Sequence, residues 1–360
     1  MKFANDHSNP QLQLEAVWSL TSIASGTTEN TKTIMDSGAM TSLIQSLGVS
    51  TTLDVIEQSI LCLGNIAGDS TQFRDDLLLA GVMDPILKII SGNPKISILR
   101  NAVWCLSNLC RGKPAPEIKF IAPSVPILCS LLSLKDADIL IDACWTFSYI
   151  SDGSNNKIDL IIQQGAIPSL ISLLSHSSDN IVEPALRTIG NIVSGDDLQT
   201  DVFIKAKGLP VVAKLFKSSK RAIRKEAVWT ISNVTAGNKS QIQAVIDENI
   251  VPELILMAQN GEADVATEAI WAISNITAGG TKEQIGYLVS KGVLKTFKEM
   301  LQKNNKSASK PLYEALENIL STDDLYPQFF EEVGGIDILS GMDDDKAIDI
   351  LDKCFGGLDI

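Results

Sequence analysis

The chain has 360 residues, of which 45% are apolar, and its formal net charge is −13. This acidic balance suits basic ligands better than nucleic acid, although acidity also favours solubility. No charge-free apolar run is long enough to span a bilayer, so we expect no membrane partner. The two histidines and six cysteines offer no catalytic triad and no paired zinc spacing. We therefore predict no enzyme, no metal and no cofactor, with the cysteines reduced.

One motif recurs along the chain at steps of 41 to 43 residues. Its clearest copies are residues 226–233 (EAVWTISN) and 268–275 (EAIWAISN). Its central position is occupied in turn by Trp18, Leu61, Trp104, Trp145, Arg187, Trp229, Trp271 and Glu314. A fixed period in this range is typical of armadillo and HEAT repeats, which stack helical units into a solenoid. We therefore predict an all-α armadillo solenoid, a right-handed superhelix of roughly eight to nine repeats with a clipped first repeat.

The period divides residues 1–360 into successive units of a single solenoid. The expected units are 1–26 (partial), 27–69, 70–112, 113–153, 154–195, 196–237, 238–280, 281–322 and 323–360 (degenerate). The partial unit ends in a helix over residues 12–23. The first full unit has short helices over 31–36 and 40–47 and then a long helix over 54–67, and later units repeat this order.

Two features stand out near the end of the chain. Residues 302–310 are polar, and we expect a linker there. Asp343, Asp344 and Asp345 are expected to cap a final helix, because acidic side chains suit a helix N-terminus. That helix contains the apolar residues Ile348, Leu351 and Phe355.

The motif also predicts which face of each long helix is available to a ligand. In the copy that begins at Glu226, one stripe at helical spacing is apolar and should be buried: Ala227, Val228, Ile231 and Val234. Trp229 and Asn233 are i, i+4 neighbours roughly opposite that stripe, with Glu226 beside them. Packing alone explains a single such Trp, but a ladder of Trp and Asn in register indicates a binding surface.

The ladder predicts the chemistry of its ligand. A column of Asn can hold the amides of an extended peptide, because Asn both donates and accepts. Parallel Trp rings form slots for the aliphatic stems of Lys or Arg, and a cation beside an indole gains ~0.5–2 kcal/mol. Carboxylates at or beside the ladder select positive charge: Asp69, Asp142, Asp152, Glu226 and Glu268. We expect an extended Lys/Arg-rich peptide whose affinity falls with salt.

Several repeats resemble the importin-α (karyopherin-α) family. The resemblance rests on residues 20–27 (LTSIASGT), 63–69 (LGNIAGD), 106–111 (LSNLCR), 184–193 (PALRTIGNIV) and 229–237 (WTISNVTAG). It covers residues 12–340, roughly, in register. It implies an adaptor for nuclear import that binds the nuclear localisation signals of cargo proteins in a concave Trp/Asn groove. It also implies shuttling between cytoplasm and nucleus.

The resemblance implies two peptide sites. The major site falls on Trp18, Ser22, Gly26, Thr31, Leu61, Asn65, Asp69, Trp104, Asn108, Asp142 and Trp145. The minor site falls on Arg187, Asn191, Glu226, Trp229, Asn233, Glu268, Trp271 and Asn275. Asp69 matches the aspartate that receives the key lysine of the peptide. Asn65 and Asn108 match residues that clamp its backbone, while Trp104 and Trp145 match slot walls.

Two residues depart from the family pattern. Ser22 stands where the family has a clamp Asn, and Leu61 stands where it has a Trp. Leucine has no π face and serine reaches less far, so we expect a major site weakened on its early-repeat side and an intact minor site. Arg187 and Tyr149, by contrast, agree with the family, which interrupts its Trp and Asn arrays at these points.

The resemblance also concerns partners. The family begins with a basic segment that binds importin-β and masks the groove, but residues 1–12 are not basic. We therefore expect importin-β to bind only through a segment absent from this chain. The family's export receptor and a nucleoporin are further implied partners, although the degenerate 323–360 end weakens this inference. The alternative is another armadillo scaffold for protein–protein assembly, without a role in import; such scaffolds lack a regular Trp/Asn ladder beside carboxylates.

Overall fold

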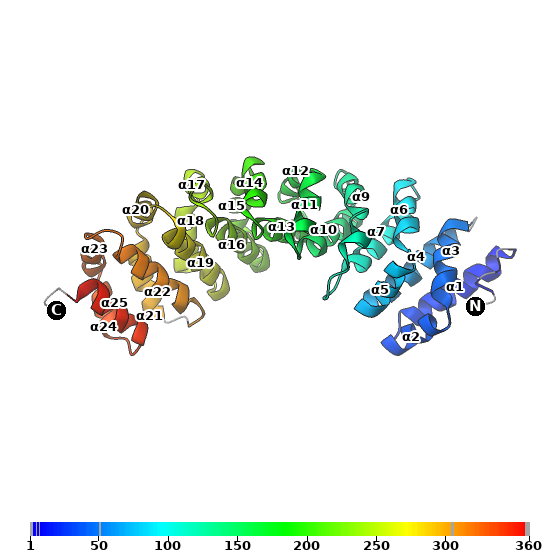
Figure 1. The fold of residues 1–360 in the computed structure, drawn as a ribbon, viewed down its shortest axis with the longest axis horizontal. Coiled ribbons are helices and arrows are strands. Elements are labelled where there is room, and N and C mark those ends of the chain that lie inside the picture. Colours follow the sequence, from blue (N-terminus) through cyan, green and yellow to red (C-terminus); the bar gives the residue numbers. More distant parts are fainter. Residues whose placement is uncertain (1–2, 5, 7, 50–51, 304–305, 357–360) are drawn as a thin grey trace. The chain divides into compact units, whose positions relative to one another are not determined.

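The computed structural model describes residues 3–4, 6, 8–49, 52–303 and 306–356, and within these ranges it holds helices and turns but no strand (Figure 1). The predicted all-α class is therefore confirmed. The chain divides into two compact units, Met1–Thr188 and Ile189–Ile360.

In the first unit, consecutive long helices pack against one another, α1 on α4, α4 on α7 and α7 on α10. Their bounds are α1 Pro10–Ala24, α4 Leu53–Asp69, α7 Ile96–Cys110 and α10 Ala137–Ser151, followed by the first part of α13 (Asp179–Val193). Shorter helices lie between them: α2 Thr28–Asp36, α3 Ala39–Val49, α5 Thr71–Leu79, α6 Met83–Ser91, α8 Ile118–Ile121, α9 Ser124–Leu131, α11 Asn155–Gln163 and α12 Ile167–Leu173. A second layer stacks in the same way, with α3 on α6 and α6 on α9.

The second unit repeats this arrangement, with α16 on α19, α19 on α22 and α22 on α25. These long helices are α16 Arg221–Thr235, α19 Ala263–Gly279, α22 Lys306–Leu320 and α25 Asp345–Phe355. The shorter elements are α14 Asp197–Lys205, α15 Gly208–Lys214, η1 Leu215–Lys217, α17 Lys239–Asp247, α18 Val251–Asn260, α20 Lys282–Ser290, α21 Val293–Lys303, α23 Tyr326–Glu332 and α24 Gly335–Ser340. Equivalent helices of successive repeats therefore stack on each other, which is how a solenoid buries its core.

The buried stripe predicted for the central motif is confirmed in α16. Ala227, Val228, Ile231 and Val234 are fully buried. Burying an aliphatic side chain of this kind stabilises the fold by about 1.5–3 kcal/mol relative to leaving it exposed. Because each long helix presents such a stripe, the ladder residues are held at a fixed place on a rigid core.

Short helices α2, α14, α17 and α20 begin with capping boxes, in which two side chains satisfy free backbone N–H groups reciprocally. In α17 the box pairs Asn238 with Gln241. Gln241 Nε2 also donates to the Asp197 carbonyl at 2.9 Å and to Asp201 Oδ1 at 3.0 Å. The same side chain therefore caps its own helix and ties it to the preceding repeat.

The prediction of a linker over residues 302–310 is wrong for most of that range. Helix α21 continues to Lys303 and α22 begins at Lys306, while residues 304–305 lie outside the described part of the chain. Ala308 is buried in α22, so packing against other helices fixes a segment whose local composition is polar. The predicted final helix is confirmed as α25, whose cap Asp344 accepts a hydrogen bond from Lys346 N at 2.9 Å.

Candidate functional site

The ladder residues lie on the long helices at the edge of the core. Trp18 on α1 is 57% exposed, and Trp104, Trp145, Trp229 and Trp271 are half-buried. Apart from Trp18, the ladder is thus less exposed than the motif suggests. Its rings remain partly accessible to a ligand.

In the first unit, Trp104 and Asn108 of α7 lie on two glycines of α4. A Cβ atom on Gly64 would come within 2.8 Å of Trp104 Cε3, and one on Gly68 would lie 3.3 Å from Asn108 Nδ2. Asn108 Nδ2 donates to the Gly64 carbonyl oxygen at 3.1 Å, and Asn108 is only 7% exposed. One amide hydrogen of this predicted clamp is therefore used to hold neighbouring repeats together.

The second unit repeats both contacts. A Cβ atom on Gly190 of α13 would come within 2.9 Å of Trp229 Cε3. Asn275 Nδ2 of α19 donates to the carbonyl oxygen of Ser232 in α16 at 2.9 Å. The ladder therefore has the same local geometry in both units, set by the preceding long helix.

Asp69, at the end of α4, offers an unsatisfied acceptor. Its Oδ1 accepts a hydrogen bond from the Thr28 hydroxyl at 3.2 Å. Its Oδ2 is shielded from solvent and has no hydrogen-bond partner among the described residues. A shielded carboxylate oxygen is costly unless it is paired, so a cation that reached this atom would stabilise it. Asn108 Nδ2 lies close to Gly68, the residue before Asp69 in α4.

On α10, an aromatic pair replaces the Trp/Asn pair. The rings of Trp145 and Tyr149 stack with their centroids 5.9 Å apart and an interplanar angle of 23°. Burial, followed by repulsion from Asp138, raises the pKa of Asp142 to about 6. Burial also raises the pKa of Tyr149, against the opposing charge of Arg111. This part of the ladder therefore combines an aromatic face with a carboxyl group that titrates near neutral pH.

The carboxylates of the second unit are more enclosed than the motif suggests. Glu226 is only 9% exposed, and burial raises the pKa of Glu268 although Lys225 opposes the shift. Asn233 Nδ2 is also shielded from solvent, and no described residue accepts a hydrogen bond from it. An unpaired donor therefore lies in the ladder of this unit.

The other predicted site residues differ in how accessible they are. Thr31 is fully buried, and its hydroxyl donates to the Thr27 carbonyl at 3.4 Å. Contrary to the prediction, its side chain is not exposed to a ligand. Helix α2 packs against α1, α3 and α4, which accounts for this burial. Among the other predicted peptide-site residues, Ser22, Gly26 and Arg187 are exposed. Leu61 and Asn65 are half-buried, and Asn191 is buried. Ser22 donates to the Trp18 carbonyl at 3.0 Å within its own helix.

Sequence reasoning missed several residues of this region: Thr28, Gly64, Arg111 and Gly190. Thr28 contacts Asp69, and Arg111 lies near Tyr149. Gly64 and Gly190 each stand three positions after a central residue that is not Trp, namely Leu61 and Arg187. This coincidence is the one feature of the sequence that could have revealed the two glycines. Asp152, predicted beside the ladder, forms an ion pair with Lys113 at 2.9 Å.

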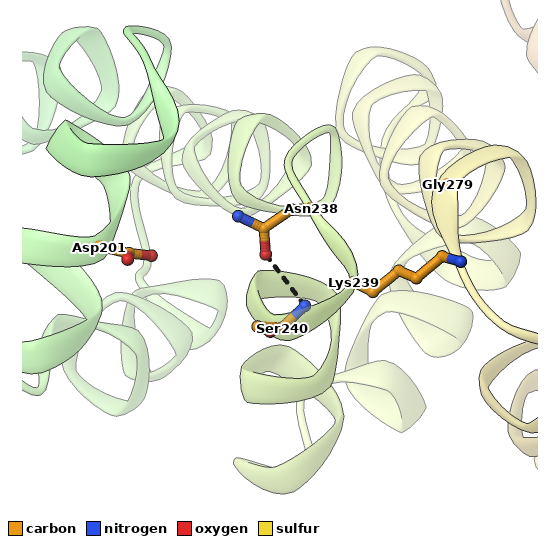
Figure 2. Close-up of a pocket in the computed structure, with 5 residues that line it drawn as sticks. All are labelled: Asp201, Asn238, Lys239, Ser240 and Gly279. Carbon is orange, nitrogen blue, oxygen red and sulfur yellow. Dashed lines mark hydrogen bonds between the residues drawn. The ribbon is translucent and has the colours of Figure 1, made fainter.

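A separate polar depression lies in the second unit, beside the start of α17. It is lined by Asp201, Asn238, Lys239, Ser240 and Gly279, which Figure 2 shows. Asn238 Oδ1 accepts a hydrogen bond from Ser240 N at 3.0 Å, and Asp201 accepts from Gln241. These polar groups serve helix capping and repeat stacking. Across the residues that the structure describes, no His/Cys/Asp/Glu group could hold a metal ion, and no helix is long and apolar enough to cross a membrane.

The Armadillo/beta-catenin-like repeat family matches residues 72–111, 154–194, 196–236 and 238–278. Importin subunit alpha-2 of Arabidopsis thaliana is 43% identical over 167 residues, 46% of this chain and 31% of that protein. Importin subunit alpha-B of Dictyostelium discoideum is 46% identical over 164 residues, 45% of this chain and 32% of that protein. The matched region spans less than a third of the length of these relatives.

Solved structures share the fold. An engineered protein superposes with a TM-score of 0.87 at 26% identity, over 97% of this chain and 85% of that one. A designed armadillo repeat protein in complex with the peptide (KR)4 gives a TM-score of 0.54 at 24% identity, over 78% of this chain and 99% of that one, which shows the fold alone. The armadillo solenoid predicted from the period is thereby confirmed. The armadillo repeats, together with 43–46% identity to importin alpha subunits over about half of this chain, support membership of the importin-α family.

Proposed function

We propose that this chain is a nuclear import adaptor that binds Lys/Arg-rich nuclear localisation signals of cargo proteins as extended peptides on its Trp/Asn ladder. The observation that carries the proposal is Asp69, whose Oδ2 is shielded and unpaired within the described residues. A lysine ammonium group would satisfy that oxygen, and a hydrogen bond to a charged group is worth about 1.5–3 kcal/mol.

The surroundings of Asp69 support the same ligand. Asn108 lies against Gly68, the residue before Asp69, and Trp104 lies one helical turn earlier on Gly64. An amide, an indole face and a carboxylate are therefore available to one extended basic peptide. The indole holds the aliphatic stem of a side chain, and the carboxylate receives its charged end.

The second unit supplies a comparable set in Trp229, Asn233, Trp271, Asn275 and the carboxylates Glu226 and Glu268. We propose that it forms the minor site and that the first unit forms the major site. A peptide with two basic clusters joined by a linker would then gain affinity over a single cluster through effective concentration.

Fluorescence anisotropy tests the proposal, with a labelled single-cluster peptide and a two-cluster peptide at low and high salt. Binding should weaken as salt rises and should be tighter for two clusters. In a Trp229→Ala background, so that binding reports on the first unit, Asp69→Asn should weaken single-cluster binding about 10- to 100-fold, the equivalent of one charged hydrogen bond. Asp84→Asn is the matched control, because Asp84 is an exposed carboxylate on α6.

If the folded protein binds neither peptide, the adaptor proposal fails, and a role as another armadillo scaffold for protein–protein assembly becomes the better interpretation. If Asp69→Asn and Asp84→Asn have equal effects, bulk acidity and not Asp69 attracts the peptide. Membership of the importin-α family further predicts an export receptor and a nucleoporin as partners, and passage between cytoplasm and nucleus. Imaging a fluorescent fusion with and without a block of nuclear export tests this passage.

A further inference from the structure

Two glycines lie directly beneath indole rings of the ladder. A Cβ atom on Gly64 would come within 2.8 Å of Trp104 Cε3, and closer still to Cζ3. The same atom on Gly190 would come within 2.9 Å of Trp229 Cε3, and again closer to Cζ3. Carbon atoms in contact are normally ~3.5–4.0 Å apart, so neither ring can keep its place above a larger residue.

The equivalent position carries a side chain in other repeats: Thr21, Ser107, Ser148, Ser232 and Ser274. The helix itself therefore does not require glycine there. Glycine in a helix interior is also less stable than alanine, because it loses more backbone freedom on folding. Neither Gly64 nor Gly190 has the positive φ angle that would demand a glycine. The close approach of the indole is the remaining physical reason for a bare backbone.

We infer that Gly64 and Gly190 are positioning residues of the two peptide sites. By lacking a side chain, each lets the indole of the following repeat lie deep against the preceding helix. That depth sets the space left above the ring for the stem of a lysine or arginine. The inference rests on the proposed function for its ligand, but the placement of the rings is independent of any ligand.

The two positions differ in how much the surroundings can adjust. At Gly64 the three nearest atoms to an added Cβ all belong to the Trp104 ring. At Gly190 the Thr230 hydroxyl oxygen is also only 3.1 Å away. Thr230 is fully buried and its hydroxyl donates to the Glu226 carbonyl at 2.8 Å. An alanine at 190 must therefore displace the indole and also shift the Thr230 hydroxyl by a few tenths of an ångström, whereas the nearest clashes of an alanine at 64 are with Trp104.

The test uses Gly64→Ala in a Trp229→Ala background, so that anisotropy reports on the first unit. We expect the Kd of the single-cluster peptide to rise about 2- to 30-fold, the range of one cation–aromatic contact. Gly48→Ala is the matched control, because an added Cβ at this helical glycine of α3 would meet nothing within 4 Å. The control should leave the Kd unchanged.

A double-mutant cycle separates positioning from general destabilisation. If Gly64 acts through Trp104, Gly64→Ala should have no further effect once Trp104 is replaced by alanine. An equal loss with and without the indole would overturn the inference, as would an unchanged Kd for Gly64→Ala. Gly190→Ala is tested in the same way in a Trp104→Ala background. Trp229→Ala is the second substitution of that double-mutant cycle.

A crystal structure of Gly64→Ala separates this inference from the adaptor proposal. We expect the Trp104 ring to move by about 1 Å or more, to restore normal carbon–carbon contact. An unmoved ring would overturn the inference even if peptides bind. Absence of peptide binding by the unmodified chain would sink the adaptor proposal, while the ring shift would still decide whether the glycine sets the position of the indole.

Discussion

The Nδ2 atom of Asn108 donates a hydrogen bond to the carbonyl oxygen of Gly64, 3.1 Å away on the preceding long helix. The same contact joins Asn275 to Ser232 in the second unit. A ladder Asn is thus part of the repeat packing as well as a candidate peptide clamp. Substitutions in the ladder therefore need a stability measurement beside every binding measurement.

Asn108→Asp should destabilise the protein by about 1–3 kcal/mol, because a carboxylate oxygen would replace the donor that faces the Gly64 carbonyl. Urea unfolding measures the change. Asn65→Asp is the control, since no described residue forms a hydrogen bond with the half-buried Asn65 side chain. Equal destabilisation by the two substitutions would contradict a structural role for the Asn108 amide.

Trp229→Ala should cost at least as much peptide affinity as Trp104→Ala. The first unit carries Ser22 and Leu61 in its ladder, and the Ser22 hydroxyl donates within its own helix. The second unit keeps two complete Trp/Asn pairs, at 229/233 and 271/275. Anisotropy with the single-cluster peptide measures both variants. A much larger loss at Trp104 than at Trp229 would count against a weakened major site.

Leu61→Trp alone should improve single-cluster binding little. By the repeat geometry, an indole at 61 would lie against Thr21, whose hydroxyl donates to the Gln58 carbonyl at 3.1 Å. Thr21→Gly with Leu61→Trp should tighten binding about 2- to 30-fold, because the indole could then lie as deep as Trp104 does. The comparison is made in a Trp229→Ala background, with Thr21→Gly alone as control. A full gain from Leu61→Trp alone would show that Thr21 does not limit this slot.

The parts of this protein that the sequence predicts are those governed by local periodicity. The stripe of Ala227 and Val228 follows from helical spacing within one motif, and the repeat follows from the fixed period. The burial of Asn108 depends instead on Gly64, which is 44 residues away and lies on another helix. Similarly, the mostly polar residues 306–310 are helical, and Ala308 among them is buried by packing against other helices. Such contacts depend on how repeats pack together, so local spacing does not reveal them.

Peptide binding in the first unit should weaken as pH falls from 7 to 5. Burial and Asp138 raise the pKa of Asp142 from 3.8 to about 6, so this carboxylate takes up a proton in that range and loses its attraction for a cation. One proton limits the effect to about tenfold per pH unit. Asp142→Asn should flatten the anisotropy titration, whereas Asp84→Asn should not.

The same carboxyl should affect stability with a definite sign. The folded state binds the Asp142 proton more tightly than the unfolded state, so its contribution to folding free energy becomes less favourable as pH rises from 3.8 to about 6. Asp142→Asn should remove this decline in urea unfolding. An identical pH dependence in the variant and the unmodified protein would contradict the raised pKa.

Arg74 should be far more important for stability than an exposed arginine. Its side chain is fully buried, and it donates to the carbonyl oxygens of Arg111 at 2.7 Å and Pro114 at 2.9 Å. Arg74→Leu leaves both carbonyls without that donor and should cost about 2–5 kcal/mol in urea unfolding. Arg100→Leu removes an exposed ion pair with Asp136 and should change stability by no more than about 1 kcal/mol.

A local measurement identifies the cause of that loss. The two carbonyls belong to residues 111–114, between α7 and α8, and Lys157 Nζ donates to the neighbouring Pro116 carbonyl at 3.0 Å. Hydrogen exchange in this connection should accelerate in Arg74→Leu before the long helices open, because the arginine holds it against α5. If exchange rises equally throughout the first unit, Arg74 supports the core as a whole and not this connection in particular.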